Sequence, residues 1–149
     1  MIVNRQRAVR VALPPLEEFL NRVRGGLGLA QADVTICLVS DAEIARMNEA
    51  YRKKIGPTDV LSFPAVARRK PVALRRLANG AKLENYLGDI AISPATAERY
   101  AKKNGRRLSG ELRILILHGV LHLLGYDHET DHGEMNRIEK FLRKRFELA

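Results

Sequence analysis

The stretch His118-Gly119-Val120-Leu121-His122-Leu123-Leu124-Gly125-Tyr126-Asp127-His128 places three of the chain's four histidines at offsets 0, +4 and +10. On a helix, residues four apart are displaced by about 6 Å along the axis and about 40° around it, so the rings of His118 and His122 point to one side. We expect Gly125 to end this helix in the left-handed conformation and to turn the chain, which brings His128 back toward the two rings. Three neutral imidazoles with a fourth position for water form the ligand set of a catalytic zinc site.

The helix that carries the first two histidines is expected to lie in the centre of the domain. Residues 112–124 are apolar on nearly every side of the helix, which is typical of a buried helix rather than a surface one. Arg113 interrupts this pattern, and its side chain has to extend to the surface or find a partner. The predicted metal site is therefore set into the core.

The segments before and after this helix predict four strands and several more helices. Apolar and β-branched runs predict strands over residues 2–11, 34–39, 60–63 and 87–92. Helical spacing of apolar residues predicts helices over 16–27 and 134–148, and the capping box over residues 40–43 starts another that runs to Tyr51. Ser93-Pro94 supplies the N-cap and first-turn proline of a further helix. The length of 149 residues predicts a single domain, residues 1–149.

The charge balance and the cysteine content narrow the class of protein. The chain has 26 Lys and Arg against 17 Asp and Glu, and this net charge of +9 favours an anionic partner such as nucleic acid or an acidic membrane surface. Residues 1–13 interrupt their apolar positions with arginine, unlike a signal peptide, and no stretch reaches membrane-spanning length. The single Cys37 excludes an intramolecular disulfide and a multi-cysteine zinc site, and its apolar surroundings predict a small buried side chain. We expect a cytoplasmic protein with no membrane partner, although the charge alone does not separate nucleic acid from an acidic membrane surface.

A long basic connection separates the third and fourth predicted strands. Residues 65–86 contain one acidic residue, Glu84, and six basic ones: Arg68, Arg69, Lys70, Arg75, Arg76 and Lys82. A connection of this length usually carries function or is disordered. Residues 72–77 are compatible with a helical turn, which Asn79-Gly80 limits. A solvated, variable loop remains the alternative to a functional one.

The residue after the first histidine decides between substrate classes. Zinc lowers the pKa of a bound water from about 16 to about 7 and polarises carbonyl or phosphoryl oxygens, so the histidines predict a hydrolase. In zinc proteases with histidines at these offsets, a glutamate general base follows the first histidine. This chain has Gly119 at that position, so peptide hydrolysis lacks its expected base. The basic surplus instead favours a phosphodiester, whose charge cationic side chains stabilise.

Four other polar residues near the motif each have two possible roles. His132 lies four residues after His128 and is either an exposed bystander or a fourth ligand, which would close the site and make the zinc structural. Asp59, Asp89 and Asp127 are the carboxylates nearest to the motifs, and caps or turns explain each of them as well as a general base does. The general base is therefore unassigned.

The chain resembles the YbeY family of bacterial single-strand endoribonucleases and ribosomal RNA maturation factors. The resemblance rests on the complete signature over residues 118–128, on Tyr51-Arg52, on the Pro57–Pro64 block PTDVLSFP, and on the Gly88–Ser93 block GDIAIS, all in family order. The basic loop over residues 65–86 departs from the family by being more basic than expected, which leaves substrate preference open.

The resemblance implies an α+β fold, a single domain in which a small mixed four-stranded sheet packs with about five helices. It implies one zinc ion held by His118, His122 and His128, and a functional Arg52 that lines the cleft and contacts the scissile phosphate. It also implies a cytoplasmic protein that processes the 3′ end of small-subunit ribosomal RNA and serves ribosome quality control, with single-stranded or ribosomal RNA, ribosomal subunits and ribosome-associated proteins as partners. The competing hypotheses are a ribosome-assembly factor with a structural zinc and, less favoured because of Gly119, a metalloprotease.

Overall fold

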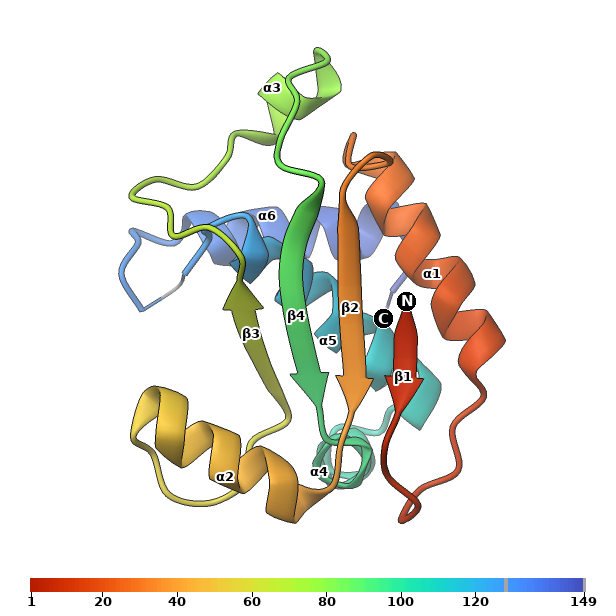
Figure 1. Ribbon diagram of the computed structural model, residues 1–149. Coiled ribbons are helices and arrows are strands. Elements are labelled where there is room, and N and C mark those ends of the chain that lie inside the picture. The colour runs from red at the N-terminus through yellow and green to blue at the C-terminus, as the bar shows by residue number, and fades with distance from the viewer. Residues whose placement is uncertain (128, 149) are drawn as a thin grey trace.

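The computed structural model describes residues 1–127 and 129–148 of the chain (Figure 1). Within those residues the chain forms four strands and six helices. They are β1 (Ile2–Asn4), α1 (Leu13–Gly26), β2 (Asp33–Leu38), α2 (Asp41–Arg52), β3 (Val60–Pro64), α3 (Leu74–Ala78), β4 (Tyr86–Ile92), α4 (Pro94–Lys103), α5 (Leu108–Leu123) and α6 (Glu134–Arg145).

The strands form one mixed sheet in the order β1-β2-β4-β3. The first three in that order are parallel, and β3 runs antiparallel to β4 at the edge. The expected α+β class with a mixed four-stranded sheet is confirmed. The helix additional to the expected five is the short α3, at the place where the sequence was compatible with a helical turn.

Helices α1, α5 and α6 cover one face of the sheet, which Figure 1 shows from the opposite side. Alternate residues of the two central strands point toward these helices, among them Ile36 paired with Ile90, and both side chains are fully buried. Helix α5 has buried residues on every side, as its sequence predicted. Arg113 of this helix finds a partner, because its guanidinium carbon lies 5.9 Å from the ring centre of Phe19.

Helix α2 packs on the other face, near one end of the sheet. Ile44 of this helix joins Val39, Leu61 and Ala91 in a small second cluster, with Cys37 partly buried beside it. The sequence predicted a buried Cys37, whereas its side chain is only partly buried because it lies at the margin of this small cluster. Burial still raises the pKa of the thiol. Within the described part of the chain, no helix is long and apolar enough to cross a membrane.

The first strand is shorter than the expected 2–11, because a local side-chain turn ends it. The side-chain Nε2 of Gln6 donates to Asn4 Oδ1 and to the Val9 carbonyl, and the Val9 backbone N–H donates back to Gln6 Oε1. These bonds satisfy the backbone in a turn rather than in a ladder. Leu13, Pro14 and Pro15 then form the first turn of α1, three residues earlier than expected.

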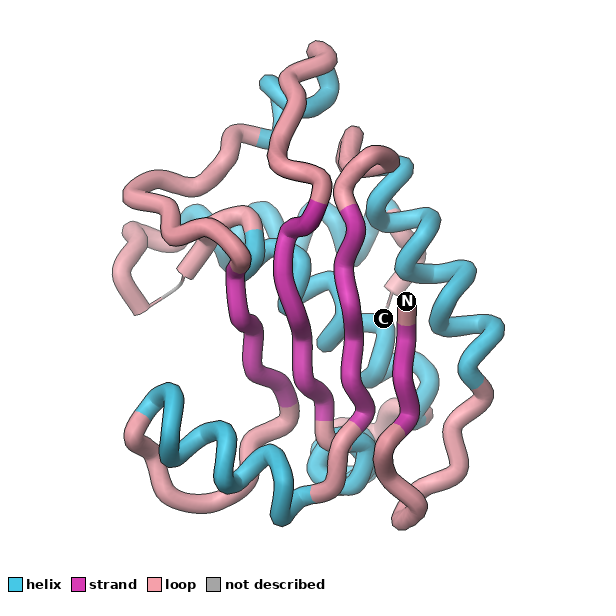
Figure 2. Tube along the Cα trace, viewed as in Figure 1, coloured by secondary structure: helices cyan, strands magenta, loops and turns pink. Residues whose placement is uncertain are grey.

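The connection between β3 and β4 leaves the sheet, forms α3 at its far end and returns (Figure 2). Two antiparallel neighbours can be joined by two residues, yet here 21 residues lie between Pro64 and Tyr86. We call residues 65–85 the basic arm.

Candidate active site

Helix α5 brings His118 and His122 together at the floor of a pocket. Their Nε2 atoms lie 3.0 Å apart, and their rings meet edge to face with centres 4.6 Å apart. The four-residue spacing and the buried position of α5 cause this convergence, because both side chains leave the same face of one helix.

The geometry of the pair is compatible with a shared zinc ion. Two ligands of a tetrahedral zinc at 2.0–2.1 Å are separated by about 3.3 Å, and the observed 3.0 Å is close to that distance. The third expected ligand, His128, lies outside the described residues. Among residues 1–127 and 129–148, no three His, Cys, Asp or Glu side chains are arranged to hold a metal.

Glu139 on α6 sets the orientation of the His118 ring. Its Oε1 lies 2.8 Å from His118 Nδ1, and only 17% of the Glu139 side chain is exposed. A carboxylate at this distance favours the tautomer with hydrogen on Nδ1, which leaves the Nε2 lone pair available to a metal. Glu139 was missed in the sequence because it lies 21 residues from His118 in a highly charged helix, where it resembles a surface residue.

Gly119 is required by the packing of α5 against the sheet. A Cβ atom at this position would lie 2.7 Å from Cδ1 and 2.9 Å from Cγ2 of Ile90. The hydroxyl of Ser62 on β3 donates to the Gly119 carbonyl over 3.4 Å. A glutamate, the base of the zinc proteases, therefore cannot occupy this position unless the Ile90 side chain or the helix shifts.

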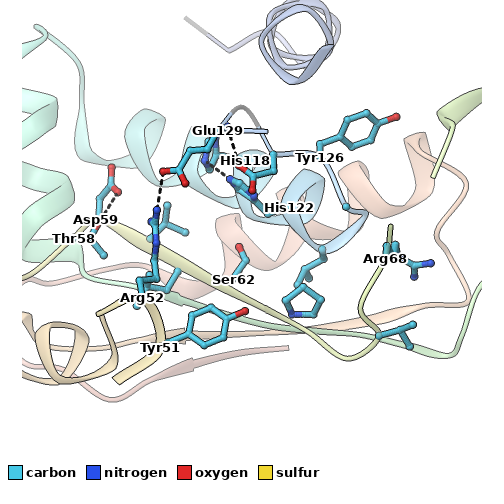
Figure 3. Close-up of a pocket in the computed structure, with 17 residues that line it drawn as sticks. Tyr51, Arg52, Thr58, Asp59, Ser62, Arg68, His118, His122, Tyr126 and Glu129 are labelled. Atoms are coloured by element: carbon cyan, nitrogen blue, oxygen red, sulfur yellow. Dashed lines mark hydrogen bonds and ion pairs between the residues drawn. The ribbon is translucent and has the colours of Figure 1, made fainter. Parts of the chain in front are cut away.

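The pocket above the histidines has a volume of about 450 Å³. Its walls come from the end of α2, from β3, from the basic arm and from the turn after α5 (Figure 3). Two arginines line it: Arg52 lies on one side of the histidine pair, and Arg68 lies on the other. The pocket thus combines paired imidazoles with cationic walls.

Arg52 forms an ion pair with Glu129 across the mouth of this pocket (Figure 3). Its Nη2 donates to Glu129 Oε1 over 2.9 Å, and Lys54 Nζ lies 3.7 Å from the same oxygen. Helix α2 ends at Arg52 because Lys53 adopts a left-handed conformation with φ 57°, and the Asn48 side chain donates to the Gly56 carbonyl of the turn that follows. The arginine suggested by the family resemblance therefore lines the pocket.

The three candidate carboxylates occupy different places. Asp59 and Asp127 line the pocket, and Asp127 also accepts the backbone N–H of Glu129 as a turn residue does. Asp89 instead accepts the hydroxyl of Tyr86 on strand β4, away from the pocket lining. Burial and this hydrogen bond to Asp89 raise the pKa of Tyr86.

His132 does not contribute to the pocket lining. Its backbone N–H donates to Glu134 at the start of α6, and its side chain is exposed. This placement agrees with the bystander reading rather than with a fourth ligand.

Comparisons with known proteins assign this chain to a class, the nucleases that hydrolyse phosphodiester bonds. The chain belongs to the Endoribonuclease YbeY family, whose sequence profile matches residues 3–147. The resemblance noted in the sequence is confirmed.

Individual relatives agree with the family assignment. A Koribacter versatilis protein named Endoribonuclease YbeY is 40% identical over 148 residues, which cover 99% of this chain and 86% of the relative. An Aquifex aeolicus protein of the same name is 40% identical over 133 residues, covering 88% of this chain and 79% of the relative. The solution structure of a Thermotoga maritima protein superimposes with a TM-score of 0.63 at 28% identity, covering 98% of this chain and 89% of that one. The fold is therefore shared over nearly the whole chain.

Proposed function

We propose that this protein is a zinc-dependent endoribonuclease that cleaves single-stranded RNA in the cytoplasm. Its substrate is the 3′ end of small-subunit ribosomal RNA, and through contacts with ribosomal subunits and their associated proteins it serves ribosome quality control. The observation that carries the proposal is the convergence of His118 and His122 to 3.0 Å between two arginines, in a chain of the Endoribonuclease YbeY family.

The residues of the pocket divide the chemical tasks among them. His118 and His122 hold the zinc together with His128, and Glu139 keeps the His118 ring in the tautomer that offers Nε2. The bound zinc supplies Lewis-acid polarisation and activation of a water. Arg52 binds the scissile phosphate and stabilises the charge that develops on it, because its guanidinium presents several donors at the pocket mouth.

Two features support RNA rather than a peptide as the substrate. Gly119 leaves the site without the glutamate of the zinc proteases, and Ile90 leaves no space for that side chain. The net charge of +9 attracts a polyanion. The ribosome-assembly factor with a purely structural zinc remains the second candidate, because basic surface contacts alone suffice for RNA binding.

Zinc content and RNA cleavage, measured on four proteins, test the proposal. The wild type is compared with His118→Ala, Arg52→Ala and the control His132→Ala, which removes a histidine that does not line the pocket. We expect His118→Ala to lose zinc and cleavage, Arg52→Ala to keep zinc but lose most cleavage, and His132→Ala to keep both.

Two outcomes would reject the proposal. Full cleavage by a zinc-free His118→Ala protein would show that the reaction does not use this site. The second outcome has two parts: a chelator unfolds the wild type, and the zinc-loaded protein does not cleave RNA. That outcome would favour the ribosome-assembly factor with a structural zinc.

A further inference from the structure

The basic arm is docked against the turn that follows the histidine helix. The Val72 backbone N–H donates to the Leu124 carbonyl over 2.9 Å, and the Tyr126 hydroxyl donates to the Val72 carbonyl over 2.9 Å. Gly125, with φ 99°, packs so closely that a Cβ there would lie 3.1 Å from the Pro71 Cα. The arm is therefore fixed relative to the pocket.

The outer part of the arm is anchored as well. Leu77 of α3 is buried in the main core, and Gly28 approaches its carbonyl so closely that a Cβ on Gly28 would lie 2.8 Å from that oxygen. Arg68 pairs with Glu84, which ties the outgoing and the returning chain together. The contacts near the pocket and those at α3 together hold the arm in one conformation, so its exposed residues form a defined surface.

That surface carries a concentrated positive charge. Glu84, the acidic residue of the arm, is used by Arg68, and the remaining five basic side chains are exposed. None of those five pairs with a carboxylate in the described part of the chain: Arg69, Lys70, Arg75, Arg76 and Lys82. The arm therefore concentrates uncompensated positive charge on a segment whose first residues, Val66 and Arg68, line the pocket.

Arg68 connects this surface to the pocket. It lines the pocket on the side away from Arg52, and only 14% of its side chain is exposed. Its Nε is buried without a hydrogen-bond acceptor among the described residues. A path of cations thus runs from Arg52, past the histidines, to Arg68 and out along the arm.

We propose that the basic arm binds single-stranded RNA on one side of the scissile bond, as an extended site continuous with the pocket. This inference rests on the proposed function, because it assumes that the pocket cleaves RNA. Binding of RNA by the arm can nevertheless be measured without cleavage. A single strand fits this path because the histidines are recessed, His118 being 21% exposed, and a flexible backbone can bend from the floor of the pocket onto the arm. Phosphates spaced along such a strand meet the exposed cations in turn.

A charge-neutralised arm tests this inference in the zinc-loaded, full-length protein. The arm variant replaces Arg69, Lys70, Arg75, Arg76 and Lys82 by glutamine. The control variant makes the same replacement at five exposed cations from the N-terminal loop, the end of α4 and the start of α5, at the end of the sheet opposite α3: Arg7, Arg10, Lys102, Lys103 and Arg107. Both variants have the same net charge and differ in the position of the cations; of the control cations, Lys102 forms an exposed ion pair with Glu98.

Binding is measured with a fluorescein-labelled twelve-nucleotide oligouridylate over a range of salt concentrations. We expect the arm variant to bind on the order of tenfold more weakly at low salt, and its salt slope to fall by about 0.7 for each lost phosphate contact. The control variant should keep most of the affinity and slope. Equal losses in the two variants, or no loss in the arm variant, would overturn the inference.

Cleavage of three labelled RNAs then locates the arm relative to the scissile bond. The wild type and the arm variant should cleave a trinucleotide equally well. The other two RNAs extend this trinucleotide on the 5′ side or on the 3′ side. We expect one of these extensions, and not the other, to raise kcat/KM in the wild type, and this increase should disappear in the arm variant. Loss of trinucleotide cleavage, or equal loss for both extensions, would contradict a one-sided extended site. If the wild type cleaves none of these RNAs, the proposed function fails, while the binding comparison still decides whether the arm holds RNA.

Discussion

Arg52 Nη2 and Glu129 Oε1 lie 2.9 Å apart, although 77 residues separate them in the sequence. The pair joins the end of α2 to the residue that follows His128, across the mouth of the pocket. If Arg52 binds the scissile phosphate as proposed, Glu129 competes with that phosphate for the guanidinium, and the RNA has to displace the carboxylate when it binds.

Replacing Glu129 by glutamine should strengthen substrate binding. The exposed ion pair contributes about 0.2–1 kcal/mol, so we expect KM for RNA to fall by about 1.5- to 5-fold at low salt and the difference to shrink at high salt. Glu147→Gln on the exposed C-terminal segment is the control for net charge. An equal effect of the two substitutions, measured by steady-state kinetics, would show that the specific pair is irrelevant.

Replacing Glu139 by alanine should weaken zinc binding through His118. Loss of a partner that orients a metal-binding histidine typically lowers metal affinity by about 10- to 100-fold, and Glu139→Gln should lose less because its amide oxygen still accepts from Nδ1–H. Competition with a chelator of known affinity measures the change. Lys140→Ala, an exposed neighbour on the same helix, should leave zinc affinity unaltered. Wild-type affinity in Glu139→Ala would rule out the orienting role.

Two glycines of α5 should respond oppositely to alanine. Gly119→Ala drives a Cβ into Ile90, and overpacking outweighs the gain in helix propensity, so we expect a loss of about 1–2 kcal/mol in the free energy of unfolding. Gly110→Ala meets nothing within 4 Å and should stabilise the protein by up to about 1 kcal/mol. Urea denaturation gives both values, and a Gly119→Ala protein as stable as Gly110→Ala would contradict the packing argument.

Asp41 should make stability depend on pH in the acid range. Burial acts to raise the pKa of Asp41, but hydrogen bonds from Ser93, Thr96 and Arg99, with the charge of Arg99, bring it below its ordinary value. The carboxylate therefore stabilises the fold fully above its unfolded pKa of about 3.9, and this contribution is lost as pH falls through the lower folded pKa. Asp41→Asn should be less stable than wild type at pH 6, and the difference in the free energy of unfolding should narrow below pH 4. A constant difference would exclude this linkage.

Local signals in the sequence were sufficient for most of the fold. The capping Ser40 accepts the Glu43 backbone N–H and starts α2 where expected, and the continuous apolar pattern of α5 corresponds to a helix buried on all sides. The extent of β1 could not be read in this way, because β-branched residues continue to residue 11 while the side chain of Gln6 turns the chain. Here a hydrogen-bonded turn overrides strand propensity.

From the sequence, only those contacts of the candidate site could be predicted whose two residues lie on the same helix. Four-residue spacing on a helix is enough to bring His118 and His122 together. Glu139 and Glu129 reach the site through the packing of α6 and the turn after α5, and no spacing in the sequence encodes those contacts. The assignment of His128 as a ligand stays a prediction, since it lies outside the described residues.

The contact between Gly119 and Ile90 has an evolutionary consequence. A route from this chain to a peptidase would need glutamate at position 119, yet that side chain would enter space filled by a central strand of the sheet. A glutamate at this position would also need a compensating change at Ile90, so the route takes at least two substitutions. Interior packing at this one position thus makes the change from this site to a peptidase site harder to reach.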